Sequence, residues 1–363
     1  MVKLRVSALA LMLAVFWYAP LSAQAQSTST FTVLYAFTGN NDGANPSTVT
    51  MVRDAQGNLY GTTHLGGDLT CNVSLHPGCG TVFKLDPAGI LTPLHIFGGG
   101  AQGLGPSGVV RDAAGNVYGT AGGGIQYGLV FKVDNGGTYT ELYNFTGGSD
   151  GNLPTGSLIL DTSGASGNLY GTTLLGGGSS DPKCPNGEGC GTIFELENTR
   201  IHKVLYSFLN NADGAEPQGV VRDNAGNFFG ATYQGGQGCL LGCGTIFKLD
   251  STGDKTVLHT FTGGKDGANP SGNLVQDSAG NLYGVTTAGG DLACPWDGGA
   301  GCGVVFKVDT KGVLTVLHAF HGGSDGNVPV SGDSRCSRKS LWNHAVRPKC
   351  EYLRNSFQAG HQK

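Results

Sequence analysis

One stretch of this chain occurs five times, and it limits what the chain can fold into. It is clearest at residues 109–120, which read Val-Val-Arg-Asp-Ala-Ala-Gly-Asn-Val-Tyr-Gly-Thr. Near-copies end at Thr63, Thr173, Thr232 and Thr286. A chain made of copies of one unit has a fold set by that unit and by the number of copies.

Each repeat contains four short apolar runs of strand length. In the second repeat they lie at 109–112, 116–120, 129–133 and 139–145, and a run of the fourth kind also precedes the first repeat at 32–37. The first two runs are joined by Asp-x-x-Gly-Asn in four copies, and glycine there supplies the positive φ of a tight hairpin turn. The pattern therefore predicts four antiparallel strands per repeat.

Four-stranded repeats of this kind are typical of an all-β protein with the β-propeller fold. Glycine supplies 64 of 363 residues, while 39% of the chain is apolar and only 13% is charged, which excludes a disordered chain and fits a protein rich in turns. A linear β-solenoid is the weaker alternative, because its shorter rungs carry no four-strand meander. We expect five complete blades over residues 31–330, with 32–37 as an additional closing strand.

The N-terminus has the pattern of a secretory signal peptide over residues 1–25. Lys3 and Arg5 precede an apolar core at 8–18, and Ala23-Gln24-Ala25 is a small-x-small cleavage site. Residues 26–30 would be a short linker. No later apolar stretch is long enough to span a membrane, so we expect export without a membrane span after cleavage. The net charge of −4, with no basic block, argues against nucleic acid as a partner.

Eight cysteines fall as pairs in the loops between the second and third strands of four repeats. The second repeat lacks both partners, and its loop is the shortest. Such both-or-neither behaviour in an exported chain predicts one local disulfide per loop. Zinc is the alternative, but the variable spacing and the absence of an accompanying histidine oppose it. The predicted pairs are Cys71–Cys79, Cys184–Cys190, Cys239–Cys243 and Cys294–Cys302.

Aspartates recur in Asp-Gly-x-x-Pro motifs before the first strand of each blade. In a propeller these loops open on one face, so the five carboxylates are candidates for a ring of oxygen ligands that holds Ca²⁺. The alternative is that Asp-Gly only makes a turn and that proline begins the next strand. The candidate metal ligands are Asp42, Asp150, Asp213, Asp266 and Asp325.

Two further recurring sets are candidates for chemistry. His95, His259 and His318 take a position of the fourth strand that is tyrosine in the other copies, which indicates a packing position with a polar tip. The arginines of the first strand, at positions 53, 111 and 222, either line the channel or face water.

The repeats resemble those of the Gloeo-Verruco (GloVer) tandem-repeat family. The resemblance rests on Gly-Asn-Leu-Tyr-Gly-Thr-Thr, followed by Gly-Gly and by Gly-Cys-Gly-Thr-Val/Ile-Phe-Lys-Leu, and it covers residues 31 to 330. It implies a secreted bacterial protein of undefined activity, and many members end in a surface-anchoring signal. No such anchor is recognisable here, and the family brings no catalytic residue with it.

The repeat pattern breaks after Pro329, and residues 331–363 are basic and poor in glycine. One permitted set of codons for residues 332–345, read one nucleotide later, spells Val-Ile-Arg-Asp-Ala-Ala-Gly-Asn-Leu-Tyr-Gly-Thr-Thr. Residues 349–359 similarly permit Phe-Gly-Thr-Pro-Phe-Lys-Leu. We therefore interpret the tail as a frameshifted sixth repeat, which makes the unshifted product six-bladed.

Every polar residue singled out above belongs to a repeated position, and repetition favours structure or binding over a single catalytic site. We expect a non-catalytic binding or scaffold protein, secreted or in the cell envelope, with a glycan or protein as its extracellular ligand. The alternative is a propeller enzyme, such as a lactonase, lyase or glycan-active hydrolase, with a metal at the acidic ring.

Overall fold

The computed structural model describes residues 32–329 with short gaps. The gaps lie at 48–50, 74–75, 123–126, 162–166, 179–183, 185–187, 198–199, 211, 295–300, 323–324 and 328. The signal peptide, linker and tail expected from the sequence lie outside the described residues. The chain divides into two units, Met1–Leu34 and Tyr35–Lys363, and the description below concerns the second.

Five antiparallel sheets, here called blades 1 to 5, follow one another along the second unit. In blade 1, β1 (Ala44–Pro46) and β2 (Val52–Arg53) both pair with β3 (Leu59–Leu65), followed by β6 (Thr81–Leu85) and β7 (Leu91–Ile96). Blade 2 has β8 (Val109–Arg111), β9 (Val117–Ala121), β10 (Leu129–Val133) and β11 (Tyr139–Asn144). Blade 3 has β12 (Asn152–Asp161), β13 (Asn168–Leu175), β14 (Thr192–Glu197) and β15 (Ile201–Ser207).

Blade 4 has β16 (Ala215–Arg222), β17 (Phe228–Gln234), β18 (Thr245–Leu249) and β19 (Lys255–Thr260). Blade 5 has β20 (Ala268–Gln276), β21 (Leu282–Ala288), β22 (Val304–Val308) and β23 (Leu314–Ala319). A small hairpin of β4 (Asn72–Val73) and β5 (His76–Pro77) and one 3₁₀ turn at Gly100–Gln102 complete the described elements. No helix among the described residues is long and apolar enough to cross a membrane.

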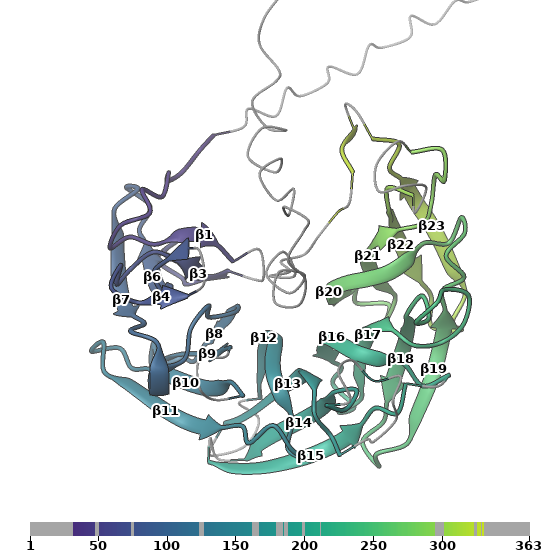
Figure 1. Ribbon diagram of the computed structural model, residues 1–363, viewed down its shortest axis with the longest axis horizontal. Coiled ribbons are helices and arrows are strands. Elements are labelled where there is room, and N and C mark those ends of the chain that lie inside the picture. The colour runs from purple at the N-terminus through teal and green to yellow at the C-terminus, as the bar shows by residue number, and fades with distance from the viewer. Residues whose placement is uncertain are drawn as a thin grey trace, which may run out of the picture. The chain divides into compact units, whose positions relative to one another are not determined.

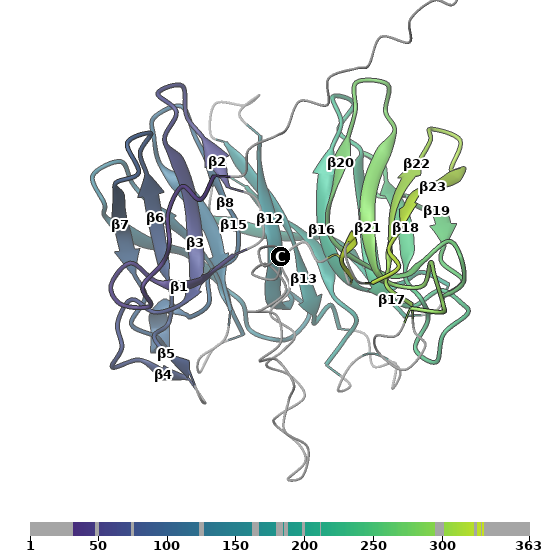
Figure 2. The same ribbon diagram turned by 90° about the horizontal axis from the view of Figure 1, so that it is seen from above.

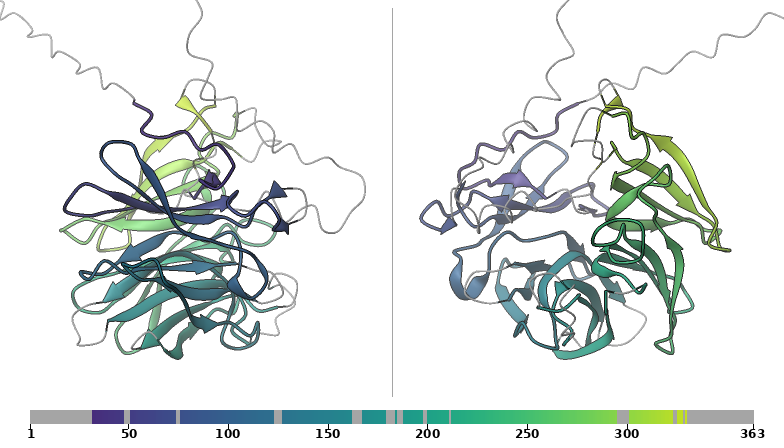
Figure 3. Two further views of the ribbon diagram at one scale, coloured as in Figure 1. Left: turned by 90° about the vertical axis from the view of Figure 1, so that its left-hand side faces the viewer. Right: turned by 45° about the vertical axis from the view of Figure 1, so that its right-hand side comes forward.

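The blades follow one another around a common centre, with the first strands β8, β12, β16 and β20 innermost and the fourth strands outermost (Figure 1). Views from above and from the side show the same succession (Figure 2, Figure 3). This arrangement of four-stranded sheets confirms the predicted all-β propeller fold.

Two details of the expected strands are wrong. Residues 32–37 form no strand, because a strand needs a partner backbone and no described segment pairs with them. The first strands of blades 3, 4 and 5 begin two residues before the proline of Asp-Gly-x-x-Pro rather than at it or after it. Proline is tolerated inside these strands because each is the edge of its sheet, where a missing N–H breaks no ladder.

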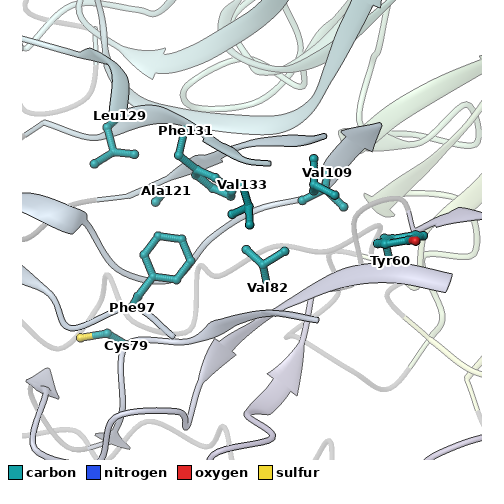
Figure 4. Packing of buried hydrophobic residues seen from close by; sticks show 10 residues of the cluster. Tyr60, Cys79, Val82, Phe97, Val109, Ala121, Leu129, Phe131 and Val133 are labelled. Carbon is teal, nitrogen blue, oxygen red and sulfur yellow. The ribbon is translucent and has the colours of Figure 1, made fainter. Parts of the chain in front are cut away.

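The apolar core lies between adjacent blades. A phenylalanine at the end of each fourth strand packs edge-to-face on the third-strand phenylalanine of the next blade, with ring centroids 5.2–5.3 Å apart. Figure 4 shows the first of these interfaces, in which Phe97 from blade 1 meets Phe131 from blade 2 beside Val82 and Val109. The four pairs are Phe97–Phe131, Phe145–Phe194, Phe208–Phe247 and Phe261–Phe306.

A glycine before each third strand makes room for the next blade. A Cβ on Gly191, whose φ is +100°, would lie 2.4 Å from the Thr173 carbonyl oxygen and 2.6 Å from Cδ of Pro217. The proline of Asp-Gly-x-x-Pro is therefore a joint between blades as well as a turn residue. The same contact joins Gly80 to Pro106, Gly128 to Pro154, Gly244 to Pro270 and Gly303 to Pro329.

The four predicted disulfides are present. Each closes a short loop between the second and third strands of its blade, and the Cα atoms of the pairs are 4.9–5.8 Å apart. In the chain-entropy account, loops of this length contribute roughly 2–2.5 kcal/mol each. The pairs are Cys71–Cys79, Cys184–Cys190, Cys239–Cys243 and Cys294–Cys302.

Candidate functional site

A cavity of about 530 Å³ lies among the first strands of the five blades. Its wall includes one β-branched residue from each blade, always two positions before the aspartate that opens the first hairpin turn. Because one register position is repeated, the wall is an aliphatic ring rather than a set of unrelated side chains. The ring consists of Val52, Val110, Ile159, Val221 and Val275.

Polar side chains from blades 3, 4 and 5 line the same cavity. Ser157 is 5% exposed, and its hydroxyl has no hydrogen-bond partner among the described residues. Asn273 reaches blade 4 so closely that a Cβ on Gly219 would lie 1.9 Å from Asn273 Oδ1, which is itself buried and without a partner there. The cavity thus combines an aliphatic wall with polar atoms able to bond a ligand.

The Asp-Gly-x-x-Pro carboxylates are bonded within their own loops. Asp150 accepts hydrogen bonds from the Tyr143 hydroxyl at 3.0 Å, the Thr146 amide at 2.8 Å and the Thr146 hydroxyl at 2.6 Å. Burial opposes ionisation of Asp150, but these bonds outweigh it and hold the pKa of the carboxyl below its ordinary value. Equivalent contacts join Tyr35–Asp42, Tyr206–Asp213, His259–Asp266 and His318–Asp325.

These contacts give the repeated aspartates a local structural role. The described residues contain no group of three or more histidine, cysteine, aspartate or glutamate side chains that could hold a metal ion. Calcium binding by Asp42, Asp150, Asp213, Asp266 and Asp325 stays a prediction, with no such cluster on which to place the ion.

The histidines of the fourth strand have the packing role expected from their exchange with tyrosine. His259 Nε2 lies 3.2 Å from Asp266 Oδ2, where other blades use a tyrosine hydroxyl. In blade 1 the loop carries Gln102 instead of aspartate, and His95 stacks on Tyr139 at 4.1 Å. Burial lowers the pKa of His95 to about 4.

The first-strand arginines bridge neighbouring blades, which resolves the two alternatives left by the sequence. The Arg111 guanidinium lies 4.9 Å from the Tyr60 ring centroid, and that of Arg222 lies 5.0 Å from the Tyr170 ring centroid. Arg222 also forms an ion pair with Asp161 of the preceding blade. These arginines are therefore inter-blade contacts, although Arg222 also borders the cavity.

We expect stability to fall as the pH is lowered from about 6.5 to about 4 because of His95. In that window the unfolded state takes up a proton on this imidazole and the folded state does not, so unfolding is favoured. Urea midpoints measured at several pH values test this. His95→Leu should flatten the profile, whereas His318→Leu, at a side chain 47% exposed, should leave it unchanged. Equal profiles for wild type and His95→Leu would contradict the assignment.

Comparisons with known proteins follow the geometry. The profile of the Gloeobacter/Verrucomicrobia repeat matches residues 21–184 and 162–341. No curated protein matches the chain. Among solved structures, a gluconolactonase from Xanthomonas campestris is 16% identical, with 80% of this chain and 78% of that chain covered and a TM-score of 0.45.

Two other solved structures have similarly distant matches. A GH74 enzyme from Niastella koreensis is 16% identical, covering 75% of this chain and 38% of that chain, with a TM-score of 0.47. A luciferin-regenerating enzyme is 14% identical, covering 79% and 96%, with a TM-score of 0.42. Likeness at this level carries no argument about activity.

Proposed function

This chain belongs to the Gloeobacter/Verrucomicrobia repeat family, and on that premise we propose that it is a non-catalytic binding or scaffold protein of the extracellular space or cell envelope. Four disulfides fit an oxidising compartment. The signal-peptide pattern at residues 1–25 supports export.

The observation that carries this proposal is the use to which the repeated polar side chains are put. The loop aspartates bond tyrosine or histidine seven residues earlier, as in Tyr143–Asp150. The turn aspartates bond asparagine and tyrosine, as Asp112 does with Asn116 and Tyr118. Groups held this way act as fixed hydrogen-bond acceptors within the fold, which favours a structural role over acid–base catalysis.

The channel cavity is the binding site we propose. Its aliphatic ring favours a ligand with an apolar body, and Ser157 and Asn273 offer hydrogen bonds to a polar group on the same ligand. A protein partner that inserts an apolar side chain and presents backbone amides meets both demands.

The neutral apolar dye Nile red serves as the probe for this cavity. We expect Val221→Asp to weaken dye binding by about tenfold, because a buried valine contributes roughly 1.5 kcal/mol of apolar contact. Val257→Asp is the matched control, since Val257 is 36% exposed on the outer strand β19. Equal dye binding by both variants would remove the channel site.

The enzymatic alternative makes the opposite prediction. Incubation with glucono-δ-lactone and Ca²⁺ should give no hydrolysis above the buffer rate if the protein only binds. Hydrolysis that EDTA abolishes and that Asp150→Asn and Asp266→Asn reduce would overturn the proposal in favour of a metal-dependent enzyme.

A further inference from the structure

Blade 1 exposes a face that every other blade buries. Met51 is 52% exposed, whereas the residues at its register position in blades 2 to 5 are 0–3% exposed. Those buried equivalents pack against the preceding blade, and blade 1 has no described blade before it. The equivalents are Val109, Leu158, Val220 and Leu274.

Two other residues on this face lack the partner that their equivalents have. Pro46 is exposed, whereas Pro154 and Pro217 are buried against a glycine of the preceding blade. Arg53 is exposed, whereas Arg111 and Arg222 stack on a tyrosine of the preceding blade. Blade 1 is therefore built to receive a blade that offers a glycine and a tyrosine at these two positions.

Blade 5 exposes the complementary face. Phe320 is only partly buried, whereas the other fourth-strand phenylalanines are 0–2% exposed beneath a phenylalanine of the next blade. Val305 is partly exposed where its four equivalents are 0% exposed, and Leu317 is 52% exposed. The equivalents of Val305 are Val82, Val130, Ile193 and Ile246.

A fragment of the preceding blade is already present beside blade 1. The Phe37 ring lies 5.2 Å from the Phe83 ring in the edge-to-face geometry of the four inter-blade pairs. The Tyr35 hydroxyl donates to Asp42 at 3.0 Å, as Tyr143 does to Asp150. Residues 35–37 thus make the side-chain contacts of a fourth strand without the backbone pairing of one.

We propose that one sixth blade covers both faces, and that the gene encodes its first three strands in a second reading frame across residues 332–359. Read one nucleotide later, these residues permit Val-Ile-Arg-Asp-Ala-Ala-Gly-Asn-Leu-Tyr-Gly-Thr-Thr and then Phe-Gly-Thr-Pro-Phe-Lys-Leu. Residues 35–37 supply the fourth strand, which closes the ring with strands from both ends of the chain.

The second frame supplies the three groups that the exposed faces lack. Its tyrosine takes the place that Tyr60 has against Arg111, and so meets Arg53. Its glycine precedes the third strand, where Gly80 contacts Pro106, and so meets Pro46. Its third-strand phenylalanine takes the place of Phe306 against Phe261, and so covers Phe320.

The spacing also fits. Six positions separate Pro106 from Asp112 in blade 2. Counting from Pro329 through Val330 and Ser331 into Val-Ile-Arg-Asp of the second frame gives the same separation. A one-nucleotide slip after Ser331 is therefore enough to restore the register of the repeat.

The first test is the DNA sequence of this locus. We expect codons that spell the repeat in the second frame, and codons that do not spell it overturn the proposal. The second test compares the printed chain with the frame-restored chain by hydrogen exchange. Restored backbone pairing should slow exchange at residues 35–37 by at least about tenfold. Equal exchange in the two chains overturns the closure even where the codons fit.

A matched variant and the oligomeric state complete the test. Arg53→Ala should lower the melting temperature of the restored chain and leave that of the printed chain unchanged, because only the former offers a tyrosine beneath the guanidinium. Should the printed chain already protect residues 35–37 and sediment as a dimer, a second copy covers these faces and the proposal is overturned.

Discussion

Replacing Lys255 with alanine is expected to lower the free energy of unfolding by about 3–5 kcal/mol, the loss typical of breaking a buried ion pair from one side. The Lys255 side chain is 3% exposed, and its ammonium lies 2.5 Å from Asp213 Oδ1 and 2.6 Å from the Asp213 carbonyl oxygen. It also lies 5.2 Å from the Phe208 ring centroid and 5.4 Å from that of Phe247. The truncation would leave the Asp213 carboxylate, 13% exposed, without its countercharge.

Urea denaturation followed by circular dichroism measures this loss. Lys203→Ala removes a lysine from an exposed position on the neighbouring β15 and should change stability by no more than about 0.5 kcal/mol. Lys255→Tyr should recover part of the loss, because Tyr139 has this position in blade 2 and its hydroxyl bonds the Gln102 carbonyl oxygen at 3.1 Å. A loss below about 1 kcal/mol for Lys255→Ala would show that the pair contributes little, as exposed pairs do.

The sequence predicted the blades because their strands are joined by local signals. The turn at Asp112 needs only its own neighbours, since Asn116 donates both its amide and its side-chain NH₂ to the same carboxylate. The disulfides were equally accessible, because each pair is separated by only four to eight positions and closes one loop. Contacts within a hairpin repeat along the chain, and repetition makes them legible.

Contacts between blades were much less accessible. The position of Lys255 in the fourth strand is Leu91, Tyr139, His202 or Leu314 in the other blades, so no pattern marks it as the partner of Asp213, 42 residues away. The same applies to the cavity: Asn273 approaches Gly219 only because blades 4 and 5 pack closely at their innermost strands. Residue type and spacing do not determine such packing distances.

The loop aspartates show a third case, in which the residues were found but two roles remained open. Asp-Gly at the rim of a propeller is compatible with a metal ring and with a capped turn. The coordinates add the Tyr143 hydroxyl and the Thr146 amide as donors to Asp150, which supports the structural role. The signal available in the sequence was the tyrosine or histidine seven positions earlier, as at Tyr143, Tyr206 and His259.

Phe261→Ala is expected to cost about 3–5 kcal/mol, the range for removing a fully buried aromatic side chain. Phe261 is 0% exposed, and its ring packs edge-to-face on Phe306 of the next blade at 5.3 Å. In a repeat protein each unit is stabilised mainly by its neighbours, so this variant weakens the interface between blades 4 and 5 directly. Urea unfolding of the purified chain gives the loss.

Phe320→Ala is the matched control, because Phe320 has the same register position in blade 5 and is only partly buried. In the printed chain its truncation should cost under about 2 kcal/mol, since less apolar area leaves water on folding. In a frame-restored chain the loss should rise to that of Phe261→Ala, because a third-strand phenylalanine would then cover the ring. Equal losses for the two variants in the printed chain would mean that another surface already covers blade 5, and would contradict an open end there.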